Sequence, residues 1–70
     1  RDPMLMAAMG DFYRQVAQEA AQLGYLPTQA WFLRWAAYFY TQGLRVRPED
    51  YKSRFSLGVT YQELNEFPRA

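Results

Sequence analysis

The sequence predicts an all-α fold of three antiparallel helices in a single domain that spans residues 1–70. Apolar residues recur at steps of three and four, and Pro and Gly residues divide the chain into three such segments. No segment shows the strict alternation that is typical of a strand, so we expect no sheet. The expected helices cover about residues 3–23, 28–44 and 48–64.

Composition excludes several classes of function. The chain has 70 residues with no Cys and no His, half of its residues are hydrophobic, and its formal net charge is +1. It therefore lacks a disulfide scaffold, thiolate and imidazole metal ligands, and a histidine base. The near-zero charge argues against non-specific binding to nucleic acid or a membrane surface, and the longest apolar stretch, residues 30–40, is too short for a membrane span. We expect a non-catalytic protein without metal or cofactor.

The first helix is expected to begin at Asp2 and Pro3, because the carboxylate caps free amides and proline suits the first helical position. It is expected to stop at Gly24, which reaches a left-handed conformation. Its apolar stripe is predicted to consist of Leu5, Ala8, Phe12, Val16, Ala20 and Leu23. Gly10 lies inside this helix, where glycine costs about 1 kcal/mol relative to alanine, so it marks either close packing or a weak point.

The second helix is expected to be covered on two sides. Thr28 is its predicted cap, and most of its circumference is apolar. Only a narrow stripe is expected to face solvent, and it consists of Arg34, Tyr38, Thr41 and Arg45. A helix of this kind needs one neighbour before it and one after it in the chain.

The third helix is expected to open at Pro48, followed by acidic residues beside the positive end of the helix dipole. Its predicted apolar stripe consists of Tyr51, Phe55, Gly58, Tyr61 and Leu64. Asn65 is the expected left-handed terminator, and Phe67 and Pro68 are expected to begin a fourth helix. Because the chain also starts at Arg1, we expect a fragment of a longer array.

Residues 51–70 carry a motif more specific than helical periodicity. Counted from Tyr51 as position 1, the residues at positions 7, 8, 11, 14, 17 and 20 are Leu57, Gly58, Tyr61, Leu64, Phe67 and Ala70. This spacing resembles the first part of a tetratricopeptide repeat, with its Leu-Gly pair, aromatic positions and alanine. The chain departs from the family at Arg54, where a bulky group is usual, and at Asn65, where glycine is usual.

The preceding stretch resembles the family more loosely. Gly43, Leu44 and Pro48 match the end of a repeat, and Tyr40 matches an aromatic position. The distance from Gly24 to Pro48 is several residues longer than the family's spacing, however. The resemblance therefore implies one and a half repeats, the first one atypical, in a right-handed stack of helical hairpins.

The resemblance implies a protein-interaction module, such as a scaffold, chaperone or assembly factor, whose concave groove is formed by the first helix of each pair. The groove-facing positions fall on Lys52, Phe55, Val59, Gln62 and Glu63. Phe55 and Val59 replace two residues of the family's carboxylate-binding clamp, so we expect an apolar partner helix or segment in the groove. In the alternative interpretation, Phe55 and Val59 are core contacts to a downstream helix.

Aromatic residues are more numerous than so small a core needs, with two Trp, six Tyr and five Phe. Trp and Tyr concentrate at the energetic centres of interfaces. We predict Trp31 and Tyr38 as partner contacts, whereas Trp35 and Tyr40 fit either the core or a contact surface.

A chain of this length buries too little apolar area to be more than marginally stable alone. Another protein, the rest of its own chain or a second copy is expected to complete it. The methionines at positions 4, 6 and 9 give the first helix an adaptable apolar edge that suits a dimer or the end of a stack.

Two other functional classes are weighed. Residues 57–64 resemble the turn and recognition helix of a helix-turn-helix DNA-binding domain, but Arg54 occupies a place that needs a small residue, and residues 45–70 hold five basic against four acidic groups. Enzymatic chemistry would have to use acidic pairs such as Glu63 and Glu66, which have no His, Cys or phosphate loop beside them. We expect neither function.

Overall fold

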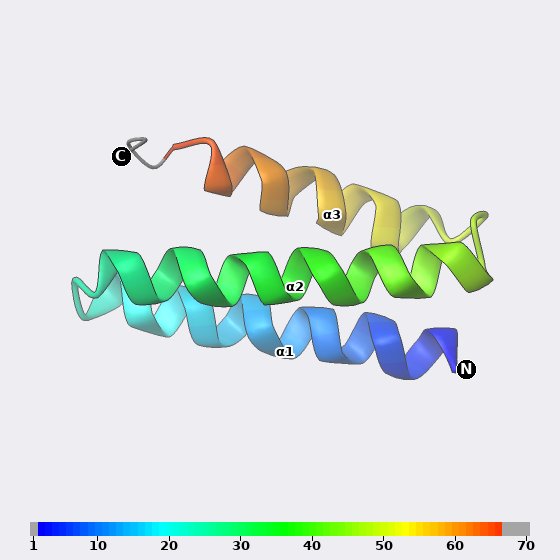
Figure 1. Ribbon diagram of the computed structural model, residues 1–70, viewed down its shortest axis with the longest axis horizontal. Helices are drawn as coiled ribbons and strands as arrows, with labels where there is room; N and C mark the ends of the chain where they lie inside the picture. The colour runs from blue at the N-terminus through cyan, green and yellow to red at the C-terminus, as the bar shows by residue number, and fades with distance from the viewer. Residues whose placement is uncertain (1, 67–70) are drawn as a thin grey trace.

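The computed structural model describes residues 2–66 and contains three helices, α1 (Pro3–Gln22), α2 (Leu26–Val46) and α3 (Tyr51–Leu64). No strand occurs in this range, so the all-α prediction is confirmed. Consecutive helices run in opposite directions, and α2 lies between α1 and α3 with α3 inclined to it (Figure 1). Helix α2 packs on both neighbours, as predicted. The expected start of a fourth helix at Phe67 lies outside the described residues.

Capping residues fix the first boundaries. The Asp2 carboxylate accepts hydrogen bonds from the N–H groups of Met4 and Leu5 at 3.0 and 3.3 Å, as predicted for the start of α1. Gly24 has a φ of 80° and follows the end of α1. Helix α2 begins at Leu26 rather than at Thr28, because proline fits the first turn of a helix, where its missing N–H has no partner to lose.

The third helix begins at Tyr51 rather than at Pro48. Its cap is Asp50, whose carboxylate accepts hydrogen bonds from the Ser53 N–H at 3.2 Å and from the Ser53 hydroxyl at 2.7 Å. At the other end, Asn65 has a φ of −70°. It is therefore right-handed, and the prediction of a left-handed terminator is wrong.

Small residues form the contact between α1 and α2. The buried positions of α1 are Gly10, Ala17 and Ala20. On α2, a Cβ atom added at Gly43 would lie 3.1 Å from the Cβ atom of Met6. Gly43 therefore permits a close approach of α2 to the start of α1, where backbone as well as side chains of α1 lie beside it.

The predicted apolar stripe of α1 is only partly correct. Ala20 is buried, but Leu5, Phe12 and Leu23 are 52%, 61% and 68% exposed. Gly10 and Ala17 are buried, and Gly10 lies against Tyr40 of α2, so this side of α1 faces the core. The larger apolar residues consequently turn toward solvent.

The predicted stripe of α3 is wrong in the same way. Ser53 and Thr60 are buried against the rest of the molecule, whereas Tyr51 and Phe55 are more than 70% exposed. The Thr60 hydroxyl donates to the carbonyl of Ser56 at 2.7 Å, so its burial leaves no donor unpaired. Small, internally satisfied hydroxyl residues let α3 lie close to α2.

Of the two roles left open for Tyr40, the structure shows the core. Tyr40 is 1% exposed and fills the interior, whereas Tyr61 is half-exposed. A Cβ atom at Gly58 would meet nothing within 4 Å. Gly58 therefore does not mark a close helix contact in the described chain.

Candidate interaction surface

Seven rings from α1 and α2 form an exposed aromatic surface, which consists of Phe12, Tyr13, Trp31, Phe32, Trp35, Tyr38 and Phe39. Tyr13 of α1 contacts the rings of α2 in this surface. Its ring stacks on Phe32, Trp35 and Phe39, with centroid separations of 5.9, 6.3 and 5.5 Å. These separations lie in the favourable range for aromatic pairs. The surface is therefore held by contacts between the two helices.

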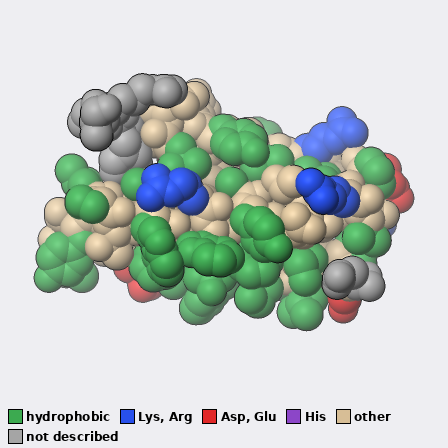
Figure 2. Space-filling view, in the orientation of Figure 1, with side chains coloured by type: hydrophobic (Ala, Val, Ile, Leu, Met, Phe, Trp, Pro, Cys, Tyr) green, Lys and Arg blue, Asp and Glu red, His purple; other side chains and the backbone are tan. Residues whose placement is uncertain are grey.

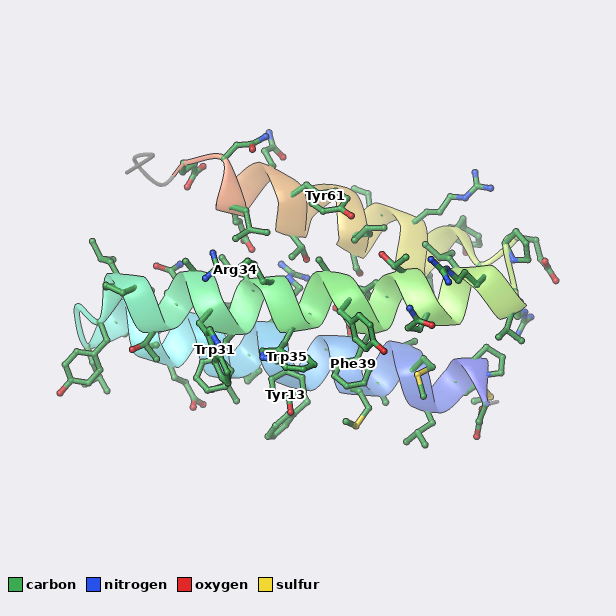
Figure 3. The ribbon with its side chains drawn as sticks, viewed as in Figure 1. Tyr13, Trp31, Arg34, Trp35, Phe39 and Tyr61 are labelled. Carbon is green, nitrogen blue, oxygen red and sulfur yellow. The ribbon has the colours of Figure 1, made fainter. Side chains whose placement is uncertain are left out.

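The outer rings of this surface remain open to solvent. Trp31 and Tyr38 are each 50% exposed, and Trp35 is 39% exposed. Trp35 meets Trp31 and Tyr38 edge to face, at 6.0 and 5.7 Å. Figure 3 shows Tyr13 close to Trp35 and Phe39 along the seam of α1 and α2, and Figure 2 shows apolar side chains gathered on this face. The narrow water-facing stripe predicted for α2 is therefore too narrow, because it omits both tryptophans.

Two open pockets lie along α2 on either side of Tyr38. One has a volume of about 410 Å³ and is lined by Trp31, Arg34, Trp35 and Tyr38. The other, of about 330 Å³, is lined by Met6, Tyr38, Phe39, Gln42, Arg45 and Val46. Each pocket thus combines apolar walls with one arginine.

Arg34 and Arg45 carry positive charge at the edge of the aromatic surface that is nearest α3. Both also line the groove between α2 and α3, with Tyr61 and Leu64 on its other side. The ion pairs found within residues 2–66 join Arg14 to Glu63 and Arg47 to Glu49, and neither involves Arg34 or Arg45. The guanidinium groups of Arg34 and Arg45 are therefore not neutralised by a carboxylate of this part of the chain.

A further pocket of about 260 Å³ lies between α1 and α3. It is lined by Met4, Ala7, Ala8, Asp11, Tyr40, Asp50, Lys52, Ser53 and Ser56. The Tyr40 hydroxyl donates to Asp11 at 2.5 Å. Burial, together with the hydrogen bond to Asp11 and the charge of that carboxylate, raises the pKa of Tyr40 to about 12. This pocket is built around a structural hydrogen bond.

The residues predicted from the resemblance recur at helical spacing along one face of α3, but they differ in exposure. Lys52 is exposed and lines the pocket between α1 and α3, while Val59 is half-buried. Phe55 and Gln62 are exposed. Glu63 is half-buried and pairs with Arg14 of α1 at 3.6 Å, so its charge is already engaged.

Trp31 and Tyr38, predicted from aromatic density alone, are brought together in one pocket with Trp35 between them. The sequence argument missed Tyr13 and Phe39 and assigned Phe12 to the core. The spacing of Gly10 and Ala17 is the signal that could have placed α1 correctly, since small residues mark the side on which helices approach.

The turn expected for a helix-turn-helix domain is absent. Residues 57–64 lie within the continuous helix α3, and Gly58 has no positive φ. The resemblance to a turn followed by a recognition helix is therefore wrong at this position.

Comparison with known proteins adds no assignment. No family model, no curated protein and no solved structure matches the chain. Within the part that the structure describes, no helix combines the length and apolar character needed to cross a bilayer. The same residues hold no group of three or more acidic side chains arranged to bind a metal ion.

Proposed function

We propose that this chain is a non-catalytic protein–protein interaction module of tetratricopeptide-repeat type, which binds an apolar helix or segment of a partner. The observation that carries the proposal is the exposed aromatic surface of α1 and α2. Large contiguous apolar patches are uncommon on monomeric proteins and mark contact sites. Trp31, Trp35 and Tyr38 are also of the residue types that dominate binding energy in interfaces.

The repeat assignment rests on the resemblance of residues 40–70 and on the pairing of the helices. Helices α1 and α2 form an antiparallel hairpin that packs through small residues, and α3 follows on the other side of α2 (Figure 1). In a repeat stack the face of α3 that carries Gly58 and Tyr61 would receive a following helix. A Cβ atom added at Gly58 would meet no neighbouring element of the described chain within 4 Å, and Tyr61 is half-exposed, so that face has room for a following helix.

We propose a primary contact other than the groove that the resemblance implies. In that groove Val59 and Glu63 are half-buried and Glu63 pairs with Arg14, whereas the exposed rings of the aromatic surface adjoin one another. We therefore place the primary contact on Trp31, Trp35 and Tyr38. Lys52, Phe55 and Gln62 are assigned a secondary contact.

The proposal is tested by affinity capture with purified bait protein in extracts of the cells that produce the chain. Three baits are compared: the unchanged chain, the double variant Trp31→Ala/Tyr38→Ala, and the matched control Gln18→Ala/Gln22→Ala, which changes two exposed residues of α1 outside the aromatic surface. We expect a partner retained by the unchanged chain and the control but lost with the aromatic variant. The captured protein is then purified, and its affinity for each bait is measured by calorimetry.

Removing Trp31 and Tyr38 should weaken that affinity by about 2 kcal/mol or more, the loss typical of central aromatic contacts. Circular dichroism of the three baits shows whether each retains its helices. Equal affinity of the partner for the unchanged chain and a folded aromatic variant would contradict the proposal.

A further inference from the structure

The aromatic surface carries information about the chemistry of its partner, because each of its two pockets includes an arginine. Arg34 stands beside Trp31, Trp35 and Tyr38 in one pocket. Arg45 stands beside Tyr38 and Phe39 in the other. Among residues 2–66, no carboxylate contributes to the lining of either pocket. A partner that lies along α2 therefore contacts apolar side chains and one positive charge in each of the two pockets.

The spacing of the two pockets matches a helix. The residues that line them are centred about seven positions apart on α2, which corresponds to roughly 11 Å at 1.5 Å per residue. Arg34 and Arg45 are eleven positions apart, or about three turns and roughly 16 Å. In a partner helix that lies along α2, residues seven or eleven positions apart lie on the same face, so they can all point toward the aromatic surface.

Resting on the proposed function, we infer that the aromatic surface binds an acidic amphipathic helix of a partner protein. Two large apolar side chains of this helix, about two turns apart, enter the pockets on either side of Tyr38. Two carboxylates about three turns apart reach Arg34 and Arg45. The apolar anchors supply most of the affinity, while the carboxylates fix register and direction.

Other occupants fit this surface less well. An aromatic surface can bind a quaternary ammonium or another cation, but Arg34 in the pocket would repel it. A membrane of anionic lipids requires a cluster of basic residues, whereas the chain has a net charge of +1. In a symmetric pair of copies, both subunits would present the same two unneutralised arginines to the interface. A carboxylate-bearing helix satisfies the apolar walls and both charges.

The two tryptophans of the chain, Trp31 and Trp35, both lie in this surface, so their fluorescence reports its occupation directly. The test uses three synthetic helical peptides of about 18 residues, long enough to span both pockets. The acidic peptide has two Leu residues seven positions apart and two Glu residues eleven positions apart. The basic peptide replaces both Glu by Lys, and the anchorless peptide replaces both Leu by Ser.

Each peptide is titrated into the full 70-residue chain and into two variants, Arg34→Glu/Arg45→Glu and Trp31→Ala/Tyr38→Ala. We expect the acidic peptide to bind the unchanged chain roughly tenfold more tightly than the basic peptide does. The charge-reversed variant should invert this order, and the anchorless peptide should not bind. The aromatic variant keeps Trp35 as a reporter and should lose both peptides.

The outcomes separate the two levels of the proposal. If the aromatic variant loses binding but charge reversal leaves the ratio of the two peptides unchanged, the acidic partner is wrong and the interaction module stands. If the aromatic variant binds as well as the unchanged chain, the proposed surface itself fails.

Three further results overturn the inference. The first is that no peptide perturbs the tryptophan emission. The second is that vesicles of phosphatidylserine shift the emission while the acidic peptide does not. The third is that sedimentation equilibrium shows a dimer whose dissociation follows the Trp31→Ala/Tyr38→Ala change.

Discussion

Gly10 of α1 lies directly against the ring of Tyr40 of α2. A Cβ atom added at Gly10 would stand 2.6 Å from Cε1 and 2.7 Å from Cδ1 of that ring. The ring is 1% exposed, and its hydroxyl donates to Asp11, one residue after Gly10. The glycine therefore makes the space that Tyr40 fills, and the neighbouring carboxylate holds the ring in it.

Gly10→Ala should destabilise the fold although alanine is the better helix former. The added methyl group would overlap the ring of Tyr40, which its hydrogen bond to Asp11 holds in place. We expect a net loss of about 1–3 kcal/mol in the free energy of unfolding, the usual cost of overpacking. Urea denaturation followed by circular dichroism measures this loss.

The matched control is Gly58→Ala in the interior of α3. Nothing lies within 4 Å of the position that the new Cβ atom would occupy. This change should stabilise the protein by about 0.5–1 kcal/mol, because alanine loses less backbone entropy in a helix. Opposite signs at the two glycines are expected; a stabilising Gly10→Ala would contradict the packing described above.

The stability of the protein should fall in alkaline solution because of Tyr40. The pKa of its phenol is about 12 in the folded chain against an ordinary value of 10.0. A raised pKa contributes stability that is complete below pH 10 and is lost as the pH rises from 10 to 12. The two-unit shift corresponds to about 2–3 kcal/mol.

Tyr40→Phe tests this linkage. Loss of the hydrogen bond to Asp11 should cost about 1 kcal/mol at neutral pH. Since phenylalanine does not titrate, the difference in stability between the two proteins should shrink and then reverse as the pH passes 10. Urea midpoints measured at several pH values give this difference, and parallel pH profiles of the two proteins would refute the role of Tyr40.

The cap of α3 should weaken in acid. The hydroxyl and N–H of Ser53 hydrogen-bond to Asp50 and hold the pKa of its carboxyl below the ordinary value of 3.8. Its stabilisation is therefore present above pH 3.8 and is lost as the pH falls through the lowered pKa. Asp50→Asn keeps an oxygen acceptor and should remove this pH dependence, whereas Asp50→Ala should loosen the helix start at every pH. Amide exchange at Ser53 reports the outcome.

The aromatic surface should contribute to binding more than to folding. Trp31 is half-exposed, so Trp31→Ala should cost about 1 kcal/mol of stability or less. Leu33, two residues later, is 1% exposed, and Leu33→Ala should cost about 2–5 kcal/mol. Thermal denaturation of the two variants measures both losses. If the two changes cost the same, Trp31 belongs to the core and the surface assignment is wrong.

Much of the local structure could be predicted from the sequence. Asp2 and Pro3 mark the start of α1, and Gly24 marks its end, because capping and left-handed turns depend on one or two residues at a time. The two boundaries that were missed lie beside prolines: Pro27 falls in the first turn of α2, whereas Pro48 precedes Asp50, the cap of α3.

The candidate site was less predictable, and the reason lies in residue shape. Periodicity identified Phe12 and Phe55 as members of apolar stripes, yet Phe12 is 61% and Phe55 74% exposed. Helices pack closely where their side chains are small, and the buried residues Ala17, Ser53 and Thr60 provide such places. Hydrophobicity alone does not distinguish a residue that fills a core from one that is left for a partner.

The three helices and their order follow from local sequence signals, because helix formation and capping are local properties of the chain. Which side of each helix faces inward depends instead on the packing of all three. That packing buried Tyr40 over Gly10, exposed Trp31 and Tyr38 beside Arg34, and joined Glu63 to Arg14. Those choices depend on how three surfaces fit at once, which no single stretch of residues encodes.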